Sequence, residues 1–89
     1  MTEIRISNHA REQMAERGIP EEMVLEIIAS PQQTVPQGEE KLIYQAVKYF
    51  EADEQHFLVR VFVNIIKQPN LVITVYRTSK ITKYWKDEN

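Results

Sequence analysis

The residues that first suggest chemistry are a histidine and an arginine on one predicted helix. In the stretch NHAREQMAERGIP, residues 8–20, His9, Gln13 and Arg17 are spaced four residues apart and therefore lie along one side of a helix. The positive end of the helix dipole disfavours a protonated imidazole, so His9 is expected to be neutral near pH 7 and able to accept a proton. Such a group suits general-base catalysis. The alternative is a surface histidine near a helix cap, with Arg17 paired to a neighbouring glutamate.

Positive charge is concentrated in the last third of the chain, although the net charge is −2. Residues 1–59 hold five Lys and Arg against eleven Asp and Glu, whereas residues 60–89 hold six against two. The first part therefore carries −6 and the second +4. An excess of positive charge favours anion binding. The alternative is that these lysines keep a strand edge and the tail soluble.

Size and composition limit the kind of site. A single domain of 89 residues has no second domain to close over a substrate, so the site is expected to be a surface groove. Cysteine is absent, which excludes disulfides and thiolate chemistry. Without an apolar run of about 18 residues or a signal peptide, a cytoplasmic protein with no membrane span is expected. Neither a glycine-rich phosphate loop nor a third ligand to join His9 and Glu12 is evident, so no cofactor and no metal are expected.

The hydrophobic pattern predicts two helices followed by four strands. A helix capped by Ser7 or Asn8 is expected to end near Arg17, and a second helix over residues 20–30 buries an apolar stripe that includes Ile27. Residues 3–7 suit either a short strand or an extended lead-in. Strands are expected near 33–36, 42–51, 56–66 and 71–78. The predicted fold is α+β, with two N-terminal helices packed on an antiparallel four-stranded meander sheet as a two-layer sandwich.

Alternation along the third predicted strand assigns its residues to two faces. Arg60 is expected on the face opposite the helices, which is the less buried one. Alternation places Arg77 with the apolar residues of the last strand and not on the open face. We therefore expect either that a bulge redirects its side chain or that it lies beyond the end of the strand. Residues 76–85, YRTSKITKYW, are expected to be ordered beside the groove that His9 faces, with Trp85 docked on the sheet or left for a partner. The residues expected to pack on the helices are Phe57, Val59, Val61, Val63 and Ile65.

The sequence resembles a small bacterial family labelled only as a domain of unknown function. The resemblance rests on the pattern His9-Ala10-x-x-x-Met14-x-x-Arg17-Gly18-Ile19 and on the ending VITVYRTSKITKYW, and it spans nearly the whole chain. The family is similar to the RelE-like and BrnT-like toxins and, more distantly, to the barnase-like ribonucleases. These share two N-terminal helices on an antiparallel sheet. The chain departs from the pattern at Pro20, where Ser or Thr is more usual, and it lacks the lysine-rich strand of RelE-like enzymes.

This resemblance implies a toxin that cleaves RNA without a metal. One residue would take the 2′-hydroxyl proton, another would protonate the leaving oxygen, and fixed cations would stabilise the phosphorane. The implied catalytic residues are His9, Arg17, Arg60 and Tyr84, with Tyr76 as an alternative to Tyr84. The implied RNA- or phosphate-binding residues are Arg77, Lys80 and Lys83.

The candidate partners are RNA, a cognate antitoxin protein and a second copy of the chain. A pI of about 5.7 is low for an RNA-binding domain, whose affinity depends on neutralising phosphates. A non-catalytic protein-interaction module of the same fold is therefore the alternative. The sequence leaves both functions open.

Overall fold

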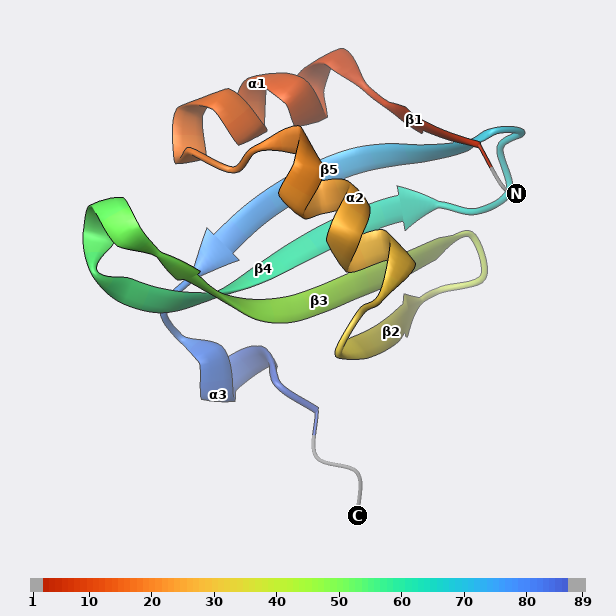
Figure 1. The fold of residues 1–89 in the computed structure, drawn as a ribbon. Helices are drawn as coiled ribbons and strands as arrows, with labels where there is room; N and C mark the ends of the chain where they lie inside the picture. Colours follow the sequence, from red (N-terminus) through yellow and green to blue (C-terminus); the bar gives the residue numbers. More distant parts are fainter. Residues whose placement is uncertain (1–2, 87–89) are drawn as a thin grey trace.

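Two helices precede a run of strands, and a short third helix follows it (Figure 1). The computed structural model describes residues 3–86. Its elements are β1 (Ile4–Ile6), α1 (Asn8–Arg17), α2 (Glu21–Ala29), β2 (Gln33–Gln37), β3 (Lys41–Phe50), the 3-10 helix η1 (Glu51–Asp53), β4 (Gln55–Asn64), β5 (Asn70–Thr78) and α3 (Ile81–Tyr84). The α+β class is confirmed. None of the helices within residues 3–86 has the length and apolar character needed to span a bilayer.

The sheet has five strands in the order β1-β5-β4-β3-β2 and is mixed. The four predicted strands form the antiparallel meander, but β1 adds to the outer edge of β5 in parallel, with Ile4 opposite Asn70 and Ile6 opposite Val72. The expectation of a four-stranded, purely antiparallel sheet was therefore wrong. The cause is local, because the free edge of β5 offers backbone partners and Ile4 and Ile6 pack against the core.

Helix α1 has the predicted termini. The Ser7 hydroxyl accepts a hydrogen bond of 3.1 Å from the backbone N–H of Ala10, and Gly18 takes the left-handed conformation at the other end, with φ of 64°. Ala10 and Met14 face the core, as expected. The backbone N–H of Ser7 donates to Val72 at 2.9 Å, so the start of α1 is fixed against β5.

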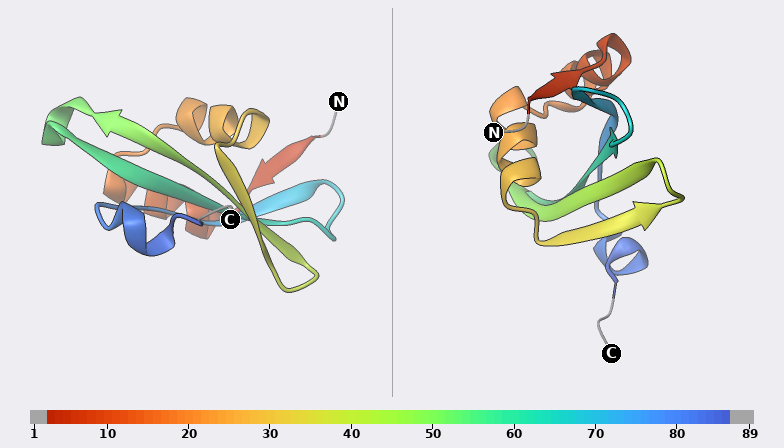
Figure 2. Two further views of the ribbon diagram at one scale, coloured as in Figure 1. Left: turned by 90° about the horizontal axis from the view of Figure 1, so that it is seen from below. Right: turned by 90° about the vertical axis from the view of Figure 1, so that its right-hand side faces the viewer.

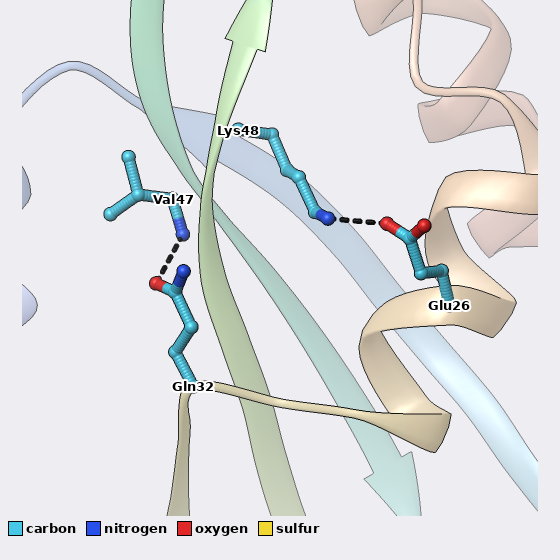
Figure 3. Close-up of polar contacts among 4 residues, drawn as sticks. All are labelled: Glu26, Gln32, Val47 and Lys48. Atoms are coloured by element: carbon cyan, nitrogen blue, oxygen red, sulfur yellow. Dashed lines mark hydrogen bonds and ion pairs between the residues drawn. The ribbon is translucent and has the colours of Figure 1, made fainter.

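Helix α2 covers the face of the sheet that forms the main core. Val24 and Ile27 have no exposed surface and pack with the central residues of β4, which confirms the predicted buried face. Two polar contacts shown in Figure 3 fix the helix and its following loop to β3. Glu26 forms an ion pair with Lys48, and the Gln32 side chain accepts a hydrogen bond of 2.9 Å from the backbone N–H of Val47.

A bulge interrupts β5 before Arg77 but does not turn this residue to the open face. Phe62 pairs with Thr74 but Val63 pairs with Val72, so Ile73 has no partner in β4. The extra residue changes the alternation, and both Val72 and Val75 are buried in the core. Beyond the bulge Arg77 pairs with Val59 and stays on the face covered by the helices. It neither turns to the open face nor lies beyond the strand end.

The residues after β5 cross to the face that α2 leaves uncovered. Figure 2 shows α2 and α3 on opposite sides of the sheet. This corrects the expectation of two helices in a two-layer sandwich, because α3 partly covers the second face. On that face Leu58 and Gln45 have no exposed surface and Ile43 has 4%. This face still has fewer buried residues than the helix-covered one, but it is more buried where α3 lies than alternation along β4 indicated.

Candidate functional site

The polar row on α1 lies against the edge of β5. Beyond Val72 this edge has no strand partner among the described residues, because β1 pairs only with residues 70–72. Gln13 accepts a hydrogen bond of 2.9 Å from the backbone N–H of Val75, and Nη1 of Arg17 donates a longer one, 3.5 Å, to the carbonyl oxygen of the same residue. Gln13 and Arg17 thus provide hydrogen-bond partners for backbone groups of an edge strand. His9, two turns before Arg17, is exposed.

Arg77 is held within the fold on the helix-covered side. Its Cζ lies 4.4 Å from the ring centres of both Phe50 and Phe57, and its Nη1 donates to Oδ2 of Asp53 at 2.7 Å. The side chain is only 20% exposed. Its charge is therefore already matched by two rings and a carboxylate, and it does not lie with Arg60.

Replacing Arg77 with glutamine is expected to lower the free energy of unfolding by about 1–2 kcal/mol, because two cation–π contacts and an ion pair are lost. Chemical denaturation measures the change. Lys80→Gln is the control, since Lys80 is exposed and lacks such partners among the described residues. An equal, negligible effect of both substitutions would show that Arg77 is not held as described.

Arg60 lies at the centre of the opposite face and is 8% exposed. Its Nε donates to Oε1 of Gln45 at 2.9 Å, and its Nη1 donates to the Tyr76 hydroxyl at 2.7 Å. Its Cζ lies 4.6 Å from the ring centre of Tyr84, 5.5 Å from that of Phe62 and 5.8 Å from that of Tyr76. The guanidinium is thus enclosed by an amide and three aromatic rings.

No carboxylate balances this buried charge within residues 3–86. The ion pairs found there use Arg11, Lys48 and Arg77 instead. A buried cation without an anion is costly, because cation–π contacts and neutral hydrogen bonds replace only part of its hydration. Every fully buried side-chain nitrogen or oxygen described has a hydrogen-bond partner, so Nη2 of Arg60, which makes no such bond within residues 3–86, is not fully buried. The guanidinium can therefore still donate to an anion.

Two glutamines hold the C-terminal segment over Arg60. Nε2 of Gln45 donates to the carbonyl oxygen of Tyr84 at 3.2 Å and to Oε1 of Gln33 at 2.8 Å. Gln33 in turn donates to the carbonyl oxygen of Lys86 at 2.6 Å and accepts from its N–H at 3.1 Å. The segment is ordered against the sheet, as predicted. It lies on the face opposite α2, however, and not beside a groove shared with His9, because the glutamines that bind it project from that face.

Among the predicted site residues, the structure brings together Arg60, Tyr84 and Lys83. Nζ of Lys83 lies 5.4 Å from the ring centre of Tyr84, the ring that also contacts Arg60. Lys80 is exposed just before α3. Gln45 and Tyr76 complete the group. Tyr76 was the alternative to Tyr84 in the sequence analysis, whereas Gln45 was not singled out. Cross-strand register with Arg60 identifies both, since Gln45 and Tyr76 are its partners on β3 and β5.

The histidine on the same face as Arg60 is His56. His56, Leu58 and Arg60 are two residues apart along β4 and therefore lie on the same face. The ring centre of His56 lies 5.0 Å from that of Tyr49, which is 50% exposed. Counting back from Arg60 in steps of two would have found it. Within the described residues, no group of three or more His, Asp or Glu side chains is arranged to hold a metal ion.

The fold and site define a small α+β domain with a buried arginine on one face of its sheet that has no carboxylate partner within residues 3–86. The chain belongs to the DUF4258 family, a domain of unknown function, whose model matches residues 6–77. Arg60 and Tyr76 lie inside the matched region, whereas Lys83 and Tyr84 follow it. No curated protein and no solved structure matches the chain.

Proposed function

We propose that the protein binds single-stranded RNA through Arg60 and cleaves it without a metal, as a toxin of the ribonuclease type or a relative of one. The observation that carries this proposal is the buried guanidinium of Arg60, which within residues 3–86 has no carboxylate partner and keeps N–H groups that make no hydrogen bond. A guanidinium matches the oxygens of a phosphate with two parallel hydrogen bonds. Partial burial strengthens that interaction, because the surrounding dielectric is low.

The proposed chemistry is attack of a ribose 2′-hydroxyl oxygen on the adjacent phosphorus, which forms a 2′,3′-cyclic phosphate and breaks the bond to the 5′-oxygen of the next nucleotide. A base takes the 2′-hydroxyl proton, and an acid gives a proton to the leaving 5′-oxygen. Arg60 stabilises the added charge of the phosphorane, and Lys83 adds positive charge beside it. Tyr76 and Tyr84 are the groups nearest Arg60 that carry transferable protons. His9 projects from α1 and is not among the contacts of Arg60, so the proposal moves proton transfer to the tyrosines, with His56 as the histidine on the correct face.

A second candidate function, a protein-interaction module, is favoured by a different observation. Gln13 and Arg17 of α1 do not contact Arg60 but form hydrogen bonds with the backbone of Val75 at the edge of β5. A groove of about 530 Å³ runs between β1, α1 and α2, and Leu25 on its wall is 42% exposed. An extended segment of a protein such as an antitoxin would fit beside the outer edge of β1.

The deciding experiment measures binding and cleavage of a labelled single-stranded RNA in the presence of EDTA. Arg60→Lys keeps the charge but loses the planar fork, so binding is expected to weaken by about tenfold and cleavage to fall further. Arg11→Lys is the matched control, because Arg11 is exposed and paired with Glu21 on α2. Failure of the unmodified protein to bind RNA even at low salt would reject this proposal and favour the protein-interaction module.

A further inference from the structure

A small cavity lies next to the Arg60 group on the same face of the sheet. It has a volume of about 370 Å³ and is lined by Val47, Ile81, Thr82 and Trp85. The volume lies near the lower end of the range of small-molecule sites, about 300–1,000 Å³. It suits one compact ring system and not an extended polymer segment.

The register of the sheet places this cavity beside the buried guanidinium. Val47 pairs with Leu58, and Arg60 follows Leu58 by two residues on the same face of β4. Such diagonal neighbours are about 7–8 Å apart. On the other wall, Trp85 follows Tyr84, whose ring lies 4.6 Å from Cζ of Arg60. A ligand with a ring in the cavity can therefore extend a charged group to Arg60.

The lining of the cavity suits the ring of such a ligand, and the residues around the cavity suit its charged group. Trp85 is half-buried and offers an aromatic surface, and Val47 and Ile81 are apolar. Lys83 and Lys86, on the same C-terminal segment, are exposed and positively charged. A flat aromatic group carrying negative charge matches both features, and a nucleotide has this composition.

We propose that this cavity is a base-binding subsite, in which one nucleobase stacks on Trp85 while its phosphate contacts Arg60. This inference rests on the proposed function, since it specifies how the RNA is held. Stacking on an aromatic ring accepts any base, so the subsite is expected to have little sequence preference. Trp85 thereby becomes a binding residue, and Val47 and Thr82 shape the space for the base.

Trp85 is the only tryptophan in the chain, so its fluorescence reports directly on the cavity. Adenosine and adenosine monophosphate are expected to quench this fluorescence, the monophosphate at lower concentration. Inorganic phosphate is expected to compete with RNA without comparable quenching. Val47→Phe fills the cavity and should weaken quenching by adenosine about tenfold, as for loss of one stacked base. Leu25→Phe on α2 is the control, because Leu25 lies in the groove beside β1.

Thr82→Phe is a second cavity-filling variant at an exposed position of α3, and it keeps the test valid should Val47→Phe destabilise the sheet. Loss of adenosine quenching in the two filled variants and not in Leu25→Phe supports the subsite. Phosphate competition at Arg60 without any response of Trp85 to adenosine overturns the subsite and leaves the proposed function standing. Quenching by adenosine monophosphate at an unchanged concentration in Arg60→Lys, together with unchanged RNA binding, overturns the proposed function instead.

Discussion

Truncating Ile27 to alanine is expected to lower the free energy of unfolding by about 2–5 kcal/mol. Ile27 has no exposed surface and packs from α2 onto Val59, Val61 and Val63, which are also fully buried. The wall of valines cannot move far to fill the space, because β4 is paired on both sides, with β3 and with β5. The truncation therefore loses both the transfer energy of the removed carbons and the contacts around a cavity.

Chemical denaturation of the unmodified protein and of Ile27→Ala measures this change in the free energy of unfolding. Leu25→Ala is the matched control on the same helix, because Leu25 is 42% exposed, and it is expected to change stability by about 0.5 kcal/mol or less. A loss of that small size for Ile27→Ala as well would mean that α2 does not bury the face described.

The main helices and strands could be predicted because their patterns are long and repeated. The four meander strands begin and end within two residues of the expected positions, since alternation over nine or ten residues in β3, β4 and β5 leaves little freedom. Ser7 and Gly18 mark the ends of α1 through their own side-chain and backbone preferences. These are local properties, which a sequence expresses directly.

Two elements are short and depend on distant partners: β1, which the sequence left as a strand or an extended lead-in, and α3, which it did not predict. β1 has three residues and α3 has four, and segments of this length have no stable periodicity of their own. β1 forms on the free edge of β5. The C-terminal segment is held by Gln45 and Gln33, which lie 39 and 53 positions before the residues they bind. The burial of Arg60 follows from that long-range contact, and alternation along β4 alone cannot reveal it.

The candidate site shows the same limit. Spacing correctly placed Gln13 and Arg17 on one side of α1. It could not reveal that both side chains form hydrogen bonds with the backbone of Val75 at the edge of β5. Arg60, Tyr84 and Lys83 were selected by residue type, and only the fold brings them together around the ring of Tyr84. The position of Gln45 became informative once the register with Arg60 was known.

Replacing Gln45 with leucine is expected to lower the free energy of unfolding by about 2–4 kcal/mol and to loosen the C-terminal segment. Gln45 is fully buried and accepts a hydrogen bond from Arg60 while it donates to Gln33 and to the carbonyl oxygen of Tyr84. Leucine has a similar volume but supplies none of these bonds. It therefore leaves the guanidinium N–H of Arg60 and the carbonyl oxygen of Tyr84 without partners in a buried place. The resulting loss of stability is larger than the gain from packing a leucine there.

Two measurements separate the two effects. Denaturation gives the loss of stability, and the fluorescence of Trp85 should move to longer wavelength if the segment after Tyr84 leaves the sheet. Gln45→Glu keeps the acceptor for Arg60 but not the donors, so it should loosen the segment while giving the buried guanidinium a carboxylate partner, and RNA binding should weaken as that charge is neutralised. Gln37→Leu, at an exposed position of β2, is expected to leave both measurements unchanged. A Gln45→Leu protein as stable as the original, with Trp85 unaltered, would show that Arg60 and the C-terminal segment do not depend on this amide.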